Sequence, residues 1–390
     1  MACEEKYTAS SDVLDLLSEQ GLGSIPEVVR ILINAAMVAE RQKFLGVGPY
    51  ERGDARMDRS NGFKPKTVNT RMGSITFDVP QVREGDFYPC SLEKGMRSER
   101  ALKVAIAELY VQGVSTRKVA AVTEKLCGLS VSSTQVSRVA AELDSVLEEW
   151  RNRPLGVFRY IILDARYEQV RHGGMVRSAA VLSAIGIEEH GKRHVLGVSV
   201  ALSEHEVHWR EFLQSLVKRG LRGVQLVVSD AHEGLAAARM AVFGSVPWQR
   251  CQFHLQQNAS AYVPRQHMKE QVASDIRSIF NAPDRASADE MLRRMVGKYE
   301  VTAPKLAAWM AEAIPQGLTI FAFPQAHQRL LRTSNMLERT NREIRRRTRV
   351  ATLFPNEASC LRLVSAVLME ISEEWESGRI YMTMTTENQT

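Results

Sequence analysis

The spacing of apolar residues divides the chain into helical and strand-like stretches. Between residues 11 and 45 apolar side chains recur at helical intervals, with a break at 21–26, which predicts two N-terminal helices. Helical spacing returns in three close segments over 98–150 and in one long segment over 356–375. Strand-like apolar runs occur at 157–163, 175–187, 194–202 and 224–228, with a shorter candidate at 246–251.

The order of these elements indicates a fold class. Amphipathic helices at 206–219 and 233–242 separate the later strands, so the middle of the chain has the order β-β-β-α-β-α-β. Three successive strands followed by strand–helix alternation is the order of a ribonuclease H-like fold. A doubly wound dinucleotide fold would need repeated βαβ units and a glycine fingerprint after the first strand, which is absent. We therefore predict a multidomain α+β protein with a ribonuclease H-like α/β domain.

Two short helices within 98–150 resemble a helix-turn-helix. Ser115 is a candidate N-cap for the first, and Ser132 or Ser133 for the second, with a glycine-containing turn between them. The second helix of such a motif enters the major groove of DNA. The side chains expected to face the bases are Ser133, Thr134, Gln135 and Arg138. A plain three-helix bundle that contacts no DNA is the alternative.

A basic region precedes these helices. Strand-like runs at 67–72 and 75–79 flank Gly73 and Ser74, which predicts a hairpin. The surrounding stretch is rich in Gly, Pro, Lys and Arg, and its candidate DNA contacts are Arg59, Lys64 and Lys66. A solvated loop with a small ribbon is the alternative.

Composition and charge narrow the class of protein. The 390 residues are 44% hydrophobic and 25% charged, which is ordinary for globular proteins and predicts two or three domains. The net charge of +6 suits a polyanionic partner. We expect no membrane-spanning segment, because we find no apolar run of the required length. Five scattered cysteines argue against a disulfide framework, so we expect a soluble intracellular protein.

Two aspartates follow apolar strands. Asp164 ends the run at 157–163, and Asp230 follows the run at 224–228. Each alone is a common first residue of a turn, but the first and fourth strands of this order are neighbours in the sheet. Two carboxylates held close together repel each other unless a cation lies between them. Oxygen ligands suit Mg²⁺ or Mn²⁺.

Glu338 is the third candidate carboxylate, at the start of a predicted basic helix that extends to 349. Asn335-x-x-Glu338 also fits a capping box, in which Glu338 would only satisfy backbone N–H groups. Residues 329–349 contain eight arginines and two glutamates, however, and the arginine fork binds phosphate oxygens bidentately. The candidate DNA contacts in this helix are Arg339, Arg342, Arg345, Arg346, Arg347 and Arg349.

These residues resemble the Mutator-type transposases of bacterial insertion sequences over nearly the whole chain. The matching motifs are Asp164-Ala165-x-Tyr167, Ser229-Asp230-x-x-x-Gly234, Cys251-x-x-His254, Arg59-x-Asn61-Gly62 and Val79-Pro80-x-Val82-Arg83. The longest match runs from Glu338-Arg339-x-Asn341-x-Glu343 to Thr348-Arg349-Val350. One departure is Glu168, where relatives often carry lysine.

The resemblance implies a DDE transposase, in which Asp164, Asp230 and Glu338 are the catalytic residues and hold two Mg²⁺ or Mn²⁺ ions per active site. Cys251 and His254 are then active-site support with a structural or positioning role, since one C-x-x-H pair is too few for a structural zinc site. The enzyme is expected to bind terminal inverted repeats and target DNA as a homodimer, in the bacterial cytoplasm at the nucleoid.

The predicted boundaries follow from these patterns. N-terminal helices are expected at 1–50, the basic hairpin region at 51–97 and the helix-turn-helix-like domain at 98–150. The ribonuclease H-like domain is expected at 151–254 and 328–375, with a helical insertion at 255–327 and a flexible tail at 376–390. Trp309 in the insertion is interpreted as a core residue, with stacking on a DNA base as the alternative.

Two other functions share parts of this pattern. A catalytically inactive or domesticated DNA-binding regulator would keep the fold and the basic helix. A stand-alone metal nuclease would not need the extensive N-terminal region. The complete carboxylate triad favours the transposase.

Overall fold

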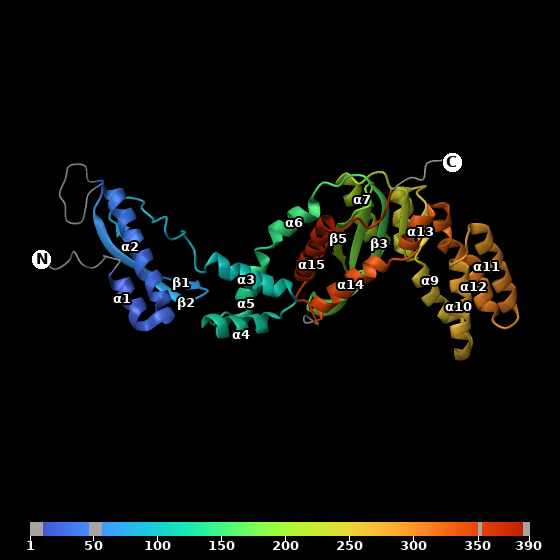
Figure 1. Cartoon of the computed structure of the whole chain (residues 1–390), viewed down its shortest axis with the longest axis horizontal. Helices are drawn as coiled ribbons and strands as arrows, with labels where there is room; N and C mark the ends of the chain where they lie inside the picture. Colours follow the sequence, from blue (N-terminus) through green and yellow to red (C-terminus); the bar gives the residue numbers. More distant parts are fainter. Residues whose placement is uncertain (1–10, 47–56, 350–352, 385–390) are drawn as a thin grey trace. The chain divides into compact units, whose positions relative to one another are not determined.

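The computed structural model describes residues 11–46, 57–349 and 353–384. They belong to two compact units, Met1–Glu142 and Leu143–Thr390 (Figure 1). Both helices and sheets are present, so the predicted mixture of α and β structure is confirmed.

The first unit begins with helices packed on a hairpin. Helix α1 (Ser11–Gln20) continues through a 3₁₀ turn (Gly21–Ser24) into α2 (Ile25–Leu45), so the expected break is only a tightening of the helix. Strands β1 (Ser60–Thr70) and β2 (Gly73–Val82) form an antiparallel hairpin. It is longer than the apolar runs indicated, because the ladder continues into the polar residues of β1.

The stretch Val13–Leu45 corrects one expectation. By length and composition alone this helical segment could cross a membrane, although we expected no apolar segment of sufficient length. In the structure its apolar face has another partner. Met37 is fully buried in a cluster with Val68, Phe77 and Val79 of the hairpin, so one face of α2 packs on the hairpin.

Three short helices complete the first unit: α3 (Arg100–Val111), α4 (Thr116–Cys127) and α5 (Ser133–Ala141). Their common core contains Leu102, Ile106, Val119 and Val136. Ser115 caps α4, and Ser132 caps α5 in a capping box.

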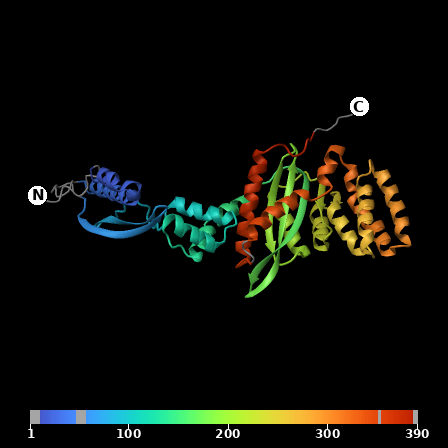
Figure 2. The same ribbon diagram turned by 60° about the horizontal axis from the view of Figure 1, so that its bottom comes forward.

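The second unit is built on a five-stranded sheet of order β5-β4-β3-β6-β7. Strand β4 (Met175–Glu188) pairs antiparallel with β3 (Phe158–His172) on one side and with β5 (Arg193–Ala201) on the other. Strands β6 (Leu226–Ser229) and β7 (Trp248–Arg250) add parallel pairs at the other edge. All five lie where apolar runs predicted strands. The β3–β4 ladder extends beyond the rest of the sheet (Figure 2).

Helices cover both faces of this sheet (Figure 1). On one face, Ile161 and Leu163 pack with residues of α7 (Glu206–Lys218) and α8 (Glu233–Phe243). Residues of α13 (Gln325–Leu331) and α14 (Asn335–Thr348) pack on Tyr160 and Ile162 from the other side. Helix α15 (Glu357–Ser377) contacts β5, where Val195 N donates to Ser372 Oγ at 3.2 Å, and α6 (Asp144–Asn152) packs on α15.

Gly234 explains how closely α7 and α8 approach each other. A Cβ atom at this position would lie 2.3 Å from the carbonyl oxygen of Glu204 and 2.8 Å from the backbone nitrogen of Glu206. The start of α8 therefore packs directly on the backbone that leads into α7. This contact gives a structural reason for the glycine in the Ser229-Asp230-x-x-x-Gly234 motif.

The chain between β7 and α14 is helical throughout. It contains α9 (Gln252–Ala259), α10 (Lys269–Phe280), α11 (Arg285–Glu300), α12 (Pro304–Ala313) and α13. Short 3₁₀ turns lie between α9 and α10 and between α12 and α13. The block has its own core, which includes Leu255, Ile276 and Leu306. Trp309 packs partly buried against that core and stacks on Tyr262 at 5.3 Å between ring centroids.

Candidate active site

The register of two parallel strands brings Asp164 and Asp230 to equivalent positions. Ile162 of β3 pairs with Val228 of β6, and each aspartate lies two residues further along its own strand direction. Neighbouring strands are separated by about 4.8 Å. The two carboxylates therefore lie side by side at the same edge of the sheet.

Helix α14 crosses the same edge and supplies two more polar side chains. Asn341 Nδ2 donates a hydrogen bond of 2.7 Å to Asp164 Oδ2. Glu338 lies three residues earlier, and residues three apart are neighbours on a helix surface. Glu338 thus lies within one helical turn of the Asn341–Asp164 contact. Arg166 of β3 donates to the carbonyl oxygen of Asn341, which holds the helix against the strand.

The environment of Asp164 opposes its ionisation. Burial raises the pKa of Asp164 to about 6, although nearby His254 and the hydrogen bond from Asn341 favour the charged form. Asp230 is more exposed and lies beside two basic groups. Arg250 Nε and His254 Nδ1 are each 4.0 Å from one of its carboxylate oxygens. These basic groups offset the repulsion between the two neighbouring carboxylates.

Cys251 and His254 flank the site from the start of α9. Hydrogen bonding with Cys251 raises the pKa of His254 to about 9, so the imidazole carries a positive charge at neutral pH. Burial opposes ionisation of Cys251, but hydrogen bonds from His254 and Ser334 hold its pKa below the ordinary value. The two side chains therefore favour each other's charged forms.

Cys251 also fixes the beginning of α14. Its Sγ lies 3.3 Å from both the hydroxyl oxygen and the backbone nitrogen of Ser334, the N-cap residue of that helix. Gln252 N donates to the carbonyl oxygen of Arg332 at 3.0 Å. Glu338 N in turn donates to Ser334 O at 3.0 Å. This chain of contacts links Cys251 to the turn that carries Glu338.

The oxygen atoms at this edge are of the chemical type that binds a hard divalent cation. Glu338 Oε1 and Asn341 Oδ1 are buried, and neither has a hydrogen-bond partner among the described residues. Carboxylate and amide oxygens are ligands for Mg²⁺ or Mn²⁺. Across the part of the chain that the structure describes, however, no three His, Cys, Asp or Glu side chains are grouped closely enough to hold a metal ion. The candidate oxygen ligands lie at one edge of the sheet but do not form a complete coordination shell for a metal ion.

The arginines of α14 occupy two different environments. Arg339, Arg342, Arg345, Arg346 and Arg349 are exposed. At 3.6 residues per turn, Arg342, Arg345 and Arg349 share the helix face of Glu338. Arg347 corrects our prediction of DNA contact, because only 6% of its side chain is exposed and it bridges Glu343 and Glu370. It faces inward with Ile344, so its role here is structural.

The predicted DNA contacts of the first unit lie on its hairpin and on α5. Arg59 and Lys64 are exposed, whereas Lys66 Nζ donates to Tyr88 Oη at 2.7 Å and to Glu93 O at 3.0 Å. Thr134 and Arg138 are exposed on α5, and Ser133 is half-buried. Gln135 is also exposed, and its Oε1 accepts from Ser132 N at 2.7 Å in the capping box.

Two polar residues at the site were not among the predicted active-site residues. Asn341 could have been found from its spacing, because it follows Glu338 by one helical turn on the same face. Arg250 gives no such signal, since its position beside Asp230 depends on the parallel pairing of β6 with β7.

Comparison with known proteins gives a consistent result. Residues 1–378 match a family described as "Transposase, Mutator family". The chain is 57% identical to the transposase for insertion sequence element IS406 of Burkholderia multivorans, covering 94% of this chain and 95% of that protein. It is 43% identical to the ISRM5 transposase of Rhizobium meliloti, covering 98% and 96%. Identity to the Staphylococcus aureus transposase of IS256 in transposon Tn4001 is 35%, covering 91% and 92%.

Proposed function

Because the chain belongs to the Mutator family of transposases, we propose that it cuts and joins DNA at the ends of an insertion sequence by DDE-type, metal-dependent phosphoryl transfer. Asp164, Asp230 and Glu338 are its catalytic carboxylates. The observation that carries this proposal is the shared edge of the sheet, where strand register aligns the two aspartates and Asn341 ties α14 to Asp164.

The fold supports the proposal in a second way. The sheet order β5-β4-β3-β6-β7, with three antiparallel strands followed by two parallel ones, matches what we expect of a ribonuclease H-like domain. In open sheets with parallel strands, sites form outside the carboxyl ends of those strands. Asp164 and Asp230 lie at this end of the β3–β6 pair.

Each group at this edge then has a task. Asp164, Asp230 and Glu338 would hold Mg²⁺ or Mn²⁺. Two such ions, when bound, would activate the attacking hydroxyl and stabilise the leaving oxygen. Asn341 orients the Asp164 carboxylate through its amide hydrogen bond. His254 holds positive charge beside Asp230, and Cys251 positions the start of α14 and therefore Glu338.

The exposed arginines of α14 are suited to binding the DNA backbone next to the reacting phosphate. Arg342, Arg345 and Arg349 extend the face that begins at Glu338, so a strand lying along this face would contact the carboxylate and the guanidinium groups together. Such contacts carry little sequence information. The hairpin and helices α4 and α5 would instead discriminate the transposon ends. Helices α4 and α5 would act as a helix-turn-helix with Ser133 and Thr134 toward the bases.

Cutting and joining two ends requires two active sites, so the active species is expected to be a homodimer on DNA. Its substrate places it in the bacterial cytoplasm at the nucleoid. An inactive DNA-binding regulator of the same fold is the alternative, and it would bind the ends without cleaving them.

The experiment incubates the purified protein with labelled duplexes that carry the element's inverted repeats, with Mg²⁺ or with EDTA, and maps the nicks. Cleavage at the repeat boundary is expected only with Mg²⁺. Asp164→Ala, Asp230→Ala and Glu338→Ala should each abolish cleavage and strand joining while retaining end binding in a gel-shift assay.

A matched control is Glu290→Ala, which removes an exposed carboxylate of α11 in the helical block. Cleavage should survive this change. Wild-type cleavage by any triad variant would remove that residue from the site. End binding with no Mg²⁺-dependent nicking by the parent protein would favour the regulator, and nicking without preference for the repeats would favour a simple nuclease.

A further inference from the structure

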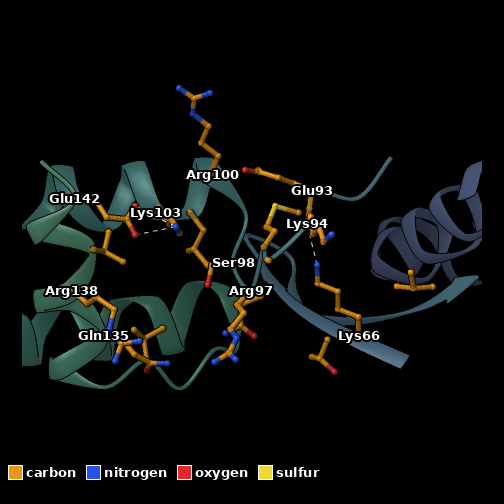
Figure 3. Close-up of a pocket in the computed structure, with 18 of the residues that line it drawn as sticks. Lys66, Glu93, Lys94, Arg97, Ser98, Arg100, Lys103, Gln135, Arg138 and Glu142 are labelled. Carbon is orange, nitrogen blue, oxygen red and sulfur yellow. Dashed lines mark hydrogen bonds and ion pairs between the residues drawn. The ribbon is translucent and has the colours of Figure 1, made fainter. Parts of the chain in front are cut away.

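The first unit contains an open cleft with a volume of about 1270 Å³ (Figure 3). Its walls come from β1, from the segment at 93–100, from the start of α3 and from α5. The volume exceeds the roughly 300–1,000 Å³ of ordinary small-molecule pockets. A site of this size that is open to solvent suits part of a polymer better than a metabolite.

The lining of the cleft is strongly basic. Seven Lys and Arg residues line it, against two Glu residues. Two of these cations are engaged, since Lys66 donates to Tyr88 and Glu93 O, while Lys103 pairs with Glu142 at 3.0 Å. The remaining cations have no acidic partner within the described residues: Lys64, Lys94, Arg97, Arg100 and Arg138. A concentration of uncompensated positive charge attracts a polyanion.

The segment between the hairpin and α3 is held in place by backbone hydrogen bonds. Asn69 N donates to Arg97 O at 3.0 Å, and Glu99 N donates to Asn69 O at 2.7 Å, which makes a short parallel bridge between Asn69 and Ser98. Glu99 also pairs with Arg71 of the hairpin turn at 3.3 Å. The backbone at Arg97 therefore sits on the end of β1, and its side chain projects from a supported position.

Three elements contribute cations to the same cleft. Lys64 comes from the hairpin, Arg97 from the connecting segment and Arg138 from α5. Arg97, Gln135 and Arg138 lie on the same side of the cleft, whereas Arg100 points away from them (Figure 3). Residues from both predicted DNA-binding elements thus meet around one space, with Arg97 between them.

We propose that this cleft binds the sugar–phosphate backbone of duplex DNA, with Lys64, Arg97 and Arg138 as phosphate ligands. The hairpin and the helix-turn-helix-like helices then bind one continuous DNA segment as a single clamp. This inference rests on the proposed function, which it deepens by assigning Arg97 and by giving Arg138 a phosphate rather than a base. Arginine is suited to this task because its planar fork binds phosphate oxygens bidentately.

The residues that line the cleft favour duplex DNA over single-stranded DNA as its ligand. Single strands are bound by aromatic side chains that stack on unpaired bases. Tyr88 is the one aromatic residue among the described residues that line the cleft, and it is covered by Lys66 at 5.3 Å from its ring centroid. The cleft therefore offers cations without a stacking surface, as expected for contact with the outside of a duplex.

The test measures binding of the full chain to inverted-repeat and unrelated duplexes by fluorescence anisotropy over a series of salt concentrations. The variants are Arg97→Ala, Arg97→Lys and the triple variant Lys64→Ala/Arg97→Ala/Arg138→Ala. Lys43→Ala and Lys269→Ala are charge-matched controls, because these exposed lysines of α2 and α10 do not line the cleft. Melting temperatures confirm that each variant is folded.

Each lost phosphate contact should reduce the slope of log K against log salt by about 0.9, so the triple variant should lose about 2.7. Affinity should fall about equally for both duplexes, Arg97→Lys should retain the slope, and the controls should match the parent. Hydroxyl-radical footprinting should show one continuous protected tract that shrinks in Arg97→Ala.

Two results would overturn the inference. An unchanged slope and footprint in the triple variant, with normal end binding by the parent, would exclude the cleft but leave the proposed function standing. Competition by single-stranded DNA or by inorganic pyrophosphate as strong as by duplex would exclude duplex backbone as the ligand. Failure of the parent protein itself to bind the ends would count against the proposed function instead.

Discussion

Asn341 of α14 donates a hydrogen bond of 2.7 Å to the carboxylate of Asp164 in β3. The bond joins two segments that are far apart in the sequence, and it leaves the amide oxygen of Asn341 buried without a partner among the described residues. Asn341 therefore fixes the orientation of Asp164 and directs a second oxygen toward the same edge.

Replacing Asn341 with Ala should slow cleavage by about 10- to 100-fold, the usual cost of losing a residue that orients a metal ligand. End binding should be unchanged. A positioning role further predicts that more Mg²⁺ is needed for half-maximal cleavage, which a titration of rate against Mg²⁺ measures. Asn258→Ala, an exposed amide of α9, is the control. An unaltered Mg²⁺ dependence in Asn341→Ala would show that the amide does not act through the carboxylate.

Cys251 should matter for the position of α14 rather than as a nucleophile. Cys251→Ala removes both contacts to Ser334 and should lower the cleavage rate together with the melting temperature. Cys251→Ser keeps a hydrogen-bonding atom and should restore part of both. Paired rate and melting measurements on the two variants test this, and a serine variant as inactive as the alanine variant at full stability would point to thiol chemistry instead.

Arg347 and Arg346 are neighbours with opposite expected roles. Arg347→Ala leaves Glu343 and Glu370 without their buried partner and should destabilise the protein by about 1–3 kcal/mol. Arg346 is 62% exposed, and its pair with Glu343 is screened by solvent, so Arg346→Ala should destabilise the protein less than Arg347→Ala but should weaken DNA binding. Urea unfolding and anisotropy titrations on both variants give the comparison. The reverse pattern would restore Arg347 to the DNA-binding face.

The pH dependence of the free energy of unfolding in acid should reveal the contribution of the ion pairs of Glu343. The hydrogen bond from Arg346 lowers the pKa of Glu343 from 4.5 to about 2, and Arg347 acts in the same direction. A lowered folded-state pKa stabilises the protein above the unfolded value and loses this effect as pH falls toward 2. Glu343→Gln should therefore be less stable than the parent at pH 6, and the difference should shrink near pH 3. A constant difference in urea midpoints at the two pH values would contradict the assignment.

The strands and the paired aspartates can be predicted because their signals are local. An apolar run that leads into an aspartate identifies each strand, although β3 continues beyond Asp164 to His172. The adjacency of Asp164 and Asp230 follows from the pairing of β3 with β6. The capping role of Gln135 can also be predicted, since Ser132-x-x-Gln135 has capping-box spacing. Arg347 was misassigned because a count of arginines along the segment does not distinguish the helix face that each one occupies.

Other features depend on contacts between distant segments and have no local signal. The basic cleft exists because Asn69 pairs with Ser98, which brings a hairpin and a helical motif to a common wall. Arg250 reaches Asp230 only through the pairing of β6 with β7. Composition by itself shows that lysines and arginines are abundant, but it does not show which of them converge.

The contacts at the base of the helical block have a consequence for how such proteins can change. Gln252 binds the backbone of Arg332 and Cys251 binds Ser334, so the block leaves the sheet and returns to it at adjacent points. Because the closure cost of a loop rises only slowly with its length, a segment with joined ends tolerates growth and shrinkage. The helical block can therefore become shorter or longer, or change its surface residues, without moving the points at which it joins the sheet. Cys251 and Gln252 would still hold the start of α14, and with it Glu338, in place.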